Sequence, residues 1–282
     1  MDKIKILDLR NDGLNIAADG QYLYIRCMKT IYKYDLDEMS LAACNEVFKK
    51  DGKSRGFSIY SDYVFLHDFL DFYILDKDSL RVMDKIRLGE DLSSDIGGVI
   101  TFDDPKVYVG IRNGRIDVLD INTKASKRFT VSDSSFWGSR AAGKYIYAGT
   151  VKGELIEIEK ETLEVTRKTV LGKKNIYSVY YHNDCIYTVS LDKSIKIIDA
   201  ETFKIVREAK KAVDGMEVKI LGIYNDCLVV AFRSKVSLWD INTLQNRGIF
   251  DFPTGRWNNG ALLCGGRLLG SDDESVYSSR LG

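Results

Sequence analysis

The chain of 282 residues is poor in the residue patterns that metal sites and common hydrolases require. It contains two histidines, His67 and His182, and five cysteines, none of which form a CxxC pair. Zinc sites use clustered Cys and His ligands at short spacings, so we expect no metal site. No GxSxG or Walker-type segment is present, and neither histidine has a nucleophile motif nearby. The sequence therefore yields no catalytic residue and no cofactor.

The chain also has no excess of charge and no long apolar run. Lys+Arg and Asp+Glu both number 41, which argues against a nucleic-acid partner because phosphate neutralisation usually needs a basic excess. No stretch approaches the ~18 apolar residues of a membrane span, and MDKIKILDLR at the start lacks the apolar core of a signal peptide. The cysteines lie mostly in strand-like apolar runs, which is typical of reduced thiols. We expect a soluble cytoplasmic protein.

A repeat of about forty residues dominates what is present. Six segments share one outline, from YLYIRCMKTIYKYD at residues 22–35 to CLVVAFRSKVSLWD at residues 227–240. Their last residues are separated by 39 to 44 positions and are Asp35, Asp76, Asp120, Glu159, Asp199 and Asp240. The next step of this size ends near Ser279. A strand-rich period of this length indicates an all-β propeller.

Each repeat predicts four antiparallel strands. Turn residues such as Asn183-Asp184 separate a short first strand from a second strand rich in Tyr, Val and Ile, and a polar loop leads to a third strand. The third strands are apolar nearly throughout, which indicates a sheet covered on both faces. Residues 160–171 have local helical character, but the repeat register favours a strand. A variable fourth strand completes the unit.

The two ends of the chain predict how the fold closes. The seventh repeat, residues 257–280, lacks its outer strand, and residues 3–9 form a strand-like stretch with no repeat of its own. Placing residues 3–9 in the last sheet removes two open sheet edges. We therefore expect one domain, residues 1–282, folded as a seven-bladed β-propeller whose N-terminal strand closes the last blade.

Over nearly its whole length the chain resembles the WD-repeat and PQQ-like families of β-propellers. VYVGIRNGRIDVLDINT and IYAGTVKGELIEIEKETL look like the PQQ-like outline, and Trp239-Asp240 looks like the Trp-Asp pair of WD repeats. The Gly-His signal of WD repeats and the Thr-Gly that ends many PQQ-like repeats are absent. The resemblance implies the architecture and not the quinone cofactor, and fold analogy carries little functional weight alone.

The candidate binding residues lie in loops expected at one face of the propeller. These loops are the segments that lead into each first strand and those that join the second and third strands. Trp, Tyr and Arg are enriched in binding hot spots, and aromatic residues in these loops could equally pack between blades or fill a channel. The candidates are Arg55, Phe69, Arg112, Trp137, Tyr177, Arg233, Arg256 and Trp257.

These observations leave several functions open. The first is a non-catalytic scaffold that binds a protein or peptide partner through this face. The second is an enzyme or small-ligand binder that gathers Asp192, Asp272, Arg112 and Arg233 at a channel mouth. The third is a sugar binder that uses Trp137 and Trp257 as stacking platforms. The acidic segment 271–274 lacks calcium-loop spacing, so we interpret it as a solvated turn.

Overall fold

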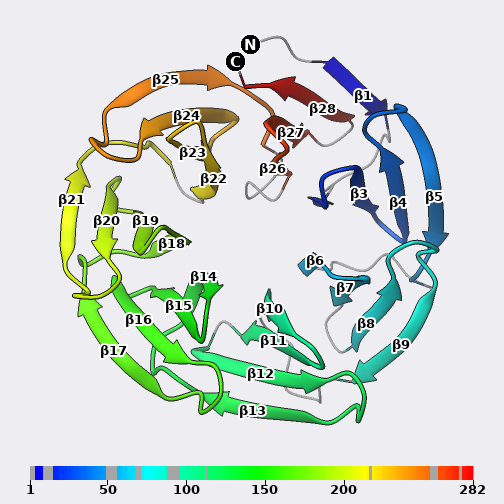
Figure 1. Ribbon diagram of the computed structural model, residues 1–282, viewed down its shortest axis with the longest axis horizontal. Helices are drawn as coiled ribbons and strands as arrows, with labels where there is room; N and C mark the ends of the chain where they lie inside the picture. The colour runs from blue at the N-terminus through cyan, green and yellow to red at the C-terminus, as the bar shows by residue number, and fades with distance from the viewer. Residues whose placement is uncertain are drawn as a thin grey trace. The chain divides into compact units, whose positions relative to one another are not determined.

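The fold is a seven-bladed β-propeller built from seven four-stranded sheets (Figure 1). The computed structural model describes residues 4–8, 15–48, 56–67, 71–87, 96–111, 113–215, 218–254, 260–272 and 275–281. All regular structure in these ranges is β-strand. They contain no helix long and apolar enough to cross a membrane. The expectations of an all-β chain and four strands per blade are confirmed.

The chain divides into two compact units. Unit 1 comprises Met1–Ser94, Ser234–Val236 and Phe250–Gly282, and unit 2 comprises Asp95–Arg233 and Ser237–Ile249. The two sheets from the first hundred residues belong to unit 1. They consist of β2 (Asn15–Ala18), β3 (Tyr22–Cys27), β4 (Thr30–Asp35) and β5 (Ser40–Glu46), followed by β6 (Gly56–Tyr60), β7 (Tyr63–His67), β8 (Asp71–Asp76) and β9 (Val82–Arg87).

The third, fourth and fifth sheets lie in unit 2, together with most of the sixth. The third and fourth consist of β10 (Ile96–Asp103), β11 (Lys106–Ile111), β12 (Arg115–Asp120) and β13 (Ser126–Thr130), then β14 (Phe136–Ala142), β15 (Tyr145–Thr150), β16 (Glu154–Glu159) and β17 (Val165–Val170). The fifth and sixth consist of β18 (Ile176–His182), β19 (Cys185–Ser190), β20 (Ile195–Asp199) and β21 (Ile205–Ala209), then β22 (Lys219–Tyr224), β23 (Cys227–Phe232), β24 (Lys235–Asp240) and β25 (Asn246–Asp251). The segment with local helical character contains β17, so the strand interpretation is confirmed.

The last sheet joins the two ends of the chain. Its order is β1-β28-β27-β26, with β1 (Ile4–Asp8) from the N-terminus and β26 (Ala261–Cys264), β27 (Arg267–Ser271) and β28 (Ser275–Arg280) from the C-terminus. β1 runs antiparallel to β28, from Ile4 opposite Ser278 to Asp8 opposite Ser275. In Figure 1 the blue β1 accordingly lies beside the red β28. Closure of the last blade by the N-terminal strand is confirmed.

The acidic residue at the end of the third strand shapes the turn that follows in six blades. In five of them the carboxylate accepts a hydrogen bond from the amide three residues later, as Asp240 does from Thr243 at 2.8 Å. Glu159 instead accepts one from the Thr162 hydroxyl at 3.2 Å. The residue after that always has a positive φ, such as 55° at Leu244. The repeated acid is therefore a turn former, which accounts for its recurrence without a role in binding.

The third strands bury side chains on both faces, as their apolar composition predicted. On β16, Leu155 packs in a cluster with residues of the β18–β21 sheet, including Ile186. The next residue, Ile156, packs in a different cluster that includes Tyr108 of the β10–β13 sheet. Because successive side chains of a strand point to opposite faces, only a sheet covered on both sides buries them all.

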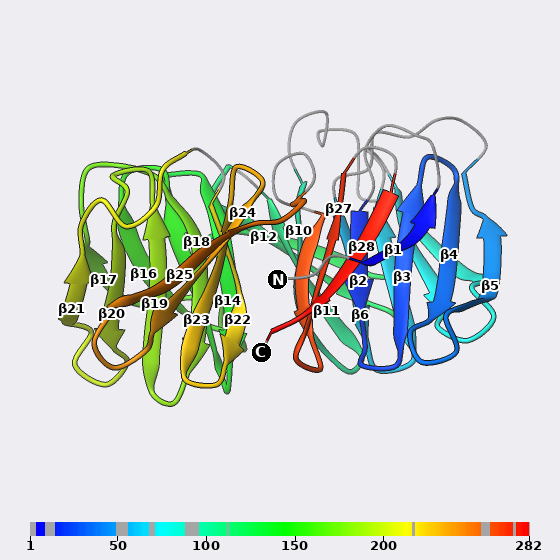
Figure 2. The ribbon, with the colours of Figure 1, turned by 90° about the horizontal axis from the view of Figure 1, so that it is seen from above.

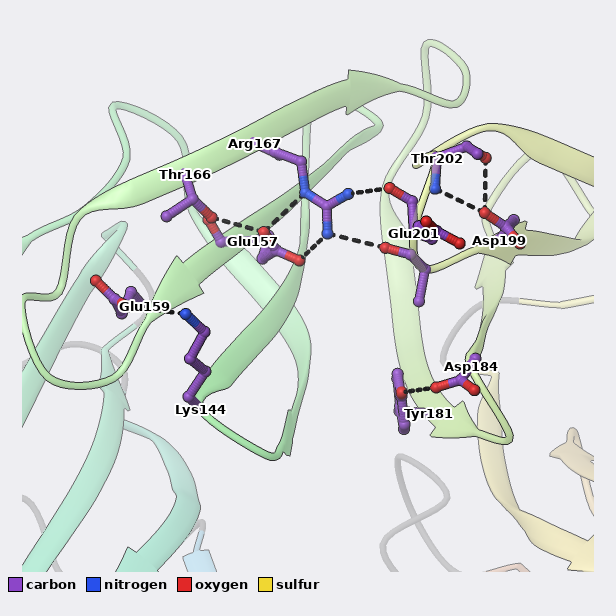
Figure 3. Close-up of polar contacts among 11 residues, drawn as sticks. Lys144, Glu157, Glu159, Thr166, Arg167, Tyr181, Asp184, Asp199, Glu201 and Thr202 are labelled. Carbon is purple, nitrogen blue, oxygen red and sulfur yellow. Dashed lines mark hydrogen bonds and ion pairs between the residues drawn. The ribbon is translucent and has the colours of Figure 1, made fainter.

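A polar contact joins the β14–β17 sheet to the β18–β21 sheet (Figure 3). Arg167 donates through Nε to the Glu157 carboxylate at 2.8 Å and through its Nη atoms to the carbonyls of Glu201 and Ala200 at 2.6 and 2.8 Å. Burial would raise the pKa of Glu157, but hydrogen bonds from Arg167 and Thr166 outweigh it and lower that pKa. The carboxylate is thus ionised in the interior and fully paired.

Candidate interaction surface

The strands of unit 2 run between two sets of connections (Figure 2). We call one set, together with the ends of the strands that adjoin it, the loop edge; it comprises residues 131–135, 151–154, 171–175, 191–196 and 208–215. The opposite set, residues 142–145, 159–164, 182–185 and 199–204, is the turn edge. Backbone hydrogen bonds of 2.8 to 2.9 Å tie the loop edge to itself, from Val151 to Ser135, Leu171 to Gly153, Leu191 to Asn175 and Ala212 to Lys193. The loop edge is therefore held by its own main chain.

Two candidate residues, Trp137 and Tyr177, meet two residues beyond this edge: the sequence placed them in loops, and the structure places them within the first strands β14 and β18. They occupy matching places in β14 and β18, where the register with the second strand shifts between Phe136 and Gly138 and between Ile176 and Ser178. A bulge leaves one residue unpaired and re-aims its side chain. The two rings lie 5.9 Å apart at 86°, an edge-to-face contact, and both side chains are half-buried. The pair is thus placed by the backbone and keeps exposed aromatic surface.

Close packing of the first strands fixes this pair. A Cβ atom added to Gly138 would lie 2.6 Å from the Tyr177 carbonyl oxygen and from the Cα atom of Ser178, so only glycine fits. The hydroxyl of Ser178 in turn accepts a hydrogen bond from the Ile220 amide at 3.1 Å. β14, β18 and β22 are therefore locked together next to the aromatic pair.

Arg233 lies in the β23–β24 turn and is exposed. Its guanidinium is 3.7 Å from the Asp214 carboxylate, which also receives the Lys193 ammonium at 2.7 Å. The structure thus places Arg233 beside the loop edge, in a network with these two residues. Exposed ion pairs of this kind contribute little to stability, so the contact of Arg233 with Asp214 is a weak one.

The two acids proposed for a channel-mouth site, Asp192 and Asp272, both accept hydrogen bonds from residues close to them in sequence. Burial would raise the pKa of Asp192, but hydrogen bonds from Ser194 and Ser190 and from Lys196 lower it to about 2. Asp272 accepts hydrogen bonds from the Ser275 amide and the Tyr277 hydroxyl, both at 2.7 Å. Asp192 is therefore ionised at neutral pH and does not act there as a proton donor. Asp272 holds the amide of Ser275 and the hydroxyl of Tyr277.

Five candidates lie outside the described residues: Arg55, Phe69, Arg112, Arg256 and Trp257. The use of Trp137 and Trp257 together as stacking platforms for a sugar stays a prediction. Within the described ranges, no group of three or more His, Cys, Asp or Glu side chains could hold a metal ion.

A second contact joins the same two strands and was not among the candidates. Arg140 lies over the Tyr180 ring, 5.0 Å from its centroid. The equal spacing of three residues from Trp137 to Arg140 and from Tyr177 to Tyr180 was the available signal.

A groove of about 590 Å³ opens on the turn edge, where Tyr108 and Gly143 lie among charged side chains. Two of its lysines are paired, since Lys160 contacts Asp103 at 2.6 Å and Lys144 contacts Glu159 at 3.5 Å, while Asp104, Lys106 and Glu161 also line it. Its lining includes one aromatic side chain, Tyr108, so the loop edge, beside the Trp137–Tyr177 pair, is the better candidate.

Comparison with known proteins supports the architecture. No known family profile matches the chain, and no curated protein matches its sequence. The β-propeller domain of Myceliophteria thermophila Cps50 (Swd1) superposes with a TM-score of 0.77 at 11% identity, covering 100% of both chains. A chain of the Mitotic Checkpoint Complex gives 0.80 at 12%, covering 99% of this chain and 91% of the other. BamB from Moraxella catarrhalis gives 0.66 at 15%, covering 97% and 86%.

The chain is thus similar in fold to propellers of both groups that the repeats resemble. The sequence contains one Trp-Asp pair, Trp239-Asp240, rather than one in each repeat. The buried Trp239 indole donates a hydrogen bond to the Ser237 hydroxyl at 2.8 Å, within its own strand. At identities this low, the similarity establishes the fold alone.

Proposed function

We propose that this chain is a non-catalytic propeller scaffold that binds a protein or peptide partner through the loop edge of unit 2. The contact between Trp137 and Tyr177 carries the proposal. Aromatic side chains held rigidly lose little conformational entropy on binding, and Trp and Tyr are enriched in binding hot spots. A half-buried aromatic pair on a fixed backbone is therefore suited to anchor a partner.

The comparisons support the same class of function. One similar propeller is a chain of the Mitotic Checkpoint Complex, a protein assembly. A rigid domain that presents loops from adjacent blades would serve this chain in the same way. We also propose a reducing compartment, which the five free cysteines support.

The test is affinity capture from the native cell, with quantitative mass spectrometry of bound proteins. The variant is Trp137→Ala/Tyr177→Ala. The matched control is Tyr224→Ala, which removes a half-buried tyrosine at the C-terminal end of β22. We expect the double variant to lose a partner that the wild type and the control both retain. Equal capture by a correctly folded double variant would contradict the proposal, as would glycan-array binding that depends on Trp137.

A further inference from the structure

The loop edge of unit 2 carries basic side chains in excess over its acids. Every described acid on this edge already contacts a lysine: Asp133 contacts Lys152 at 2.9 Å, Glu154 contacts Lys168 at 3.1 Å, and Asp214 contacts Lys193 at 2.7 Å. Asp192 and Glu208 both contact the buried ammonium of Lys196, at 3.1 and 3.2 Å. No acid on this edge is left to neutralise a further base.

Three exposed lysines of the same edge have no ion pair among the described residues: Lys173, Lys174 and Lys211. The first two stand next to each other in the connection that leads into β18, a few residues before Tyr177. Hydrogen bonds from Leu171 to Gly153 and from Leu191 to Asn175 hold that connection at both ends. The backbone that carries these two positive charges is therefore held three and four residues before Tyr177 in the chain.

The turn edge of unit 2 has the opposite balance of charge, with more acids than bases. Its six acids are Glu159, Glu161, Glu164, Asp184, Asp199 and Glu201, and its bases are Lys144, Lys160 and Lys204. The whole chain has a formal charge of zero, so this polarity is local and does not follow from composition. Separated charge of this kind orients an approaching partner and selects its sign.

We propose that the partner segment bound by the loop edge is acidic and carries an apolar or aromatic anchor. The anchor packs on Trp137 and Tyr177, and its flanking carboxylates contact Lys173 and Lys174. This inference rests on the proposed function and adds the chemistry of the partner. A peptide fits better than a nucleic acid because, among the described lysines of this edge, only Lys173, Lys174 and Lys211 lack an acid partner, whereas neutralising a continuous phosphate chain takes many bases.

The experiment selects peptides from a displayed random library on the full chain. The same selection is run on Lys173→Glu/Lys174→Glu and on a matched control, Lys106→Glu/Lys204→Glu. The control makes the same change of charge at two exposed lysines, one at the start of β11 and one on the turn edge, neither with an ion pair among the described residues. Enriched peptides are then synthesised, with Asn/Gln versions of their Asp/Glu residues, and binding is measured by fluorescence anisotropy at low and high salt.

We expect the enriched peptides to combine excess Asp and Glu with apolar residues. Affinity should fall about tenfold in Lys173→Glu/Lys174→Glu and with the Asn/Gln peptides, stay within about twofold in the control, and weaken as salt rises. Enrichment without an acidic excess, or no enrichment, would overturn the inference. So would tighter binding of a single-stranded oligonucleotide, or self-association that Lys173→Glu/Lys174→Glu abolishes, since the edge would then serve nucleic acid or a second copy.

The two proposals fail in different ways. If Trp137→Ala/Tyr177→Ala removes peptide binding and Lys173→Glu/Lys174→Glu leaves it unchanged, the edge binds a partner but not through its charge, so the inference alone is wrong. If neither variant changes binding, the loop edge is not the binding site and both are wrong.

Discussion

Arg167 and Glu157 form a charge pair that links two blades. Glu157 is 1% exposed, and the arginine opposite it on β17 binds its carboxylate in a bidentate manner and also reaches two carbonyls of the next sheet (Figure 3). A guanidinium suits this place because its planar donors can satisfy several acceptors at once. Removing one member of such a pair strands a buried charge, which costs more than the pair itself contributes.

We therefore expect Arg167→Ala to lower the free energy of unfolding by about 3 kcal/mol. Urea unfolding at neutral pH measures this. The matched control is Arg207→Ala, because Arg207 takes the same place on β21, opposite Ile197 instead of an acid, and is exposed. Its loss should change stability by less than about 0.5 kcal/mol. Adding Glu157→Gln to Arg167→Ala should recover part of the loss. Equal effects of the two alanine variants would show that the buried pair is not the cause.

The contact between β14 and β18 gives a second prediction. In Gly138→Ala the new methyl group would meet backbone atoms of the neighbouring strand at 2.6 Å, and backbone cannot move aside as a side chain can. We expect a loss of about 2 kcal/mol and a changed near-ultraviolet circular dichroism signal from the neighbouring Trp137–Tyr177 pair. Thermal and urea unfolding measure the stability.

The control for that variant is Gly143→Asn. A Cβ atom at Gly143 meets nothing within 4 Å, and Asn183 already adopts a similar positive φ of 46° at the matching turn of the next blade. This change should leave both the stability and the aromatic signal nearly unaltered. A near-neutral Gly138→Ala would mean that the two strands can separate slightly, and the aromatic pair would then be less rigid than the structure indicates.

Much of the fold could be predicted because the repeat is encoded locally. The acid that ends the third strand in six blades, as at Asp120 and Asp199, recurs because each copy forms its own turn, so spacing alone locates the strands. The pairing of β1 with β28 was predictable from what the last repeat lacked. Both inferences depend on counting along the chain, which sequence permits.

The contacts between blades could not be predicted in the same way. Arg167 and Ala200 are far apart in sequence, and neither belongs to a recognisable motif. The aromatic pair was half predictable: Trp137 and Tyr177 were both candidates, but their contact depends on bulges in two separate strands. The ionised state of Asp192 depends on Ser190, Ser194 and Lys196 together, and no single spacing in the sequence predicts that.

The lowered pKa of Asp192 predicts that part of the protein's stability is lost at acidic pH. Its folded pKa of about 2 lies below the ordinary value of 3.8, so the carboxylate stabilises the fold above about pH 4 and this contribution disappears as the pH falls toward 2. The shift corresponds to about 2 kcal/mol. We expect Asp192→Asn to be less stable than the wild type at pH 6 and the two stabilities to converge near pH 2.

Urea unfolding across this pH range measures both curves. The control is Asp133→Asn: the exposed Lys152 lowers the pKa of this carboxyl too, but solvent screens an exposed pair, so that curve should follow the wild type closely. Parallel curves for wild type and Asp192→Asn would show that the carboxylate titrates normally and that its hydrogen bonds are not formed in solution.

The N-terminal strand gives the last prediction. Removing the residues before Arg10 would leave β28 with an unpaired edge in a sheet of three strands, since β1 is its only neighbour on that side. Unpaired edges lose hydrogen bonds and invite association, so we expect a clearly lower thermal midpoint and more aggregation on heating. A synthetic peptide of residues 1–9, added to the truncated chain, should raise the midpoint as its concentration rises, because a ligand that binds only the folded state stabilises it by mass action. A scrambled peptide of the same composition should have no effect. An unchanged midpoint after truncation would show that β1 contributes nothing to closing the last blade.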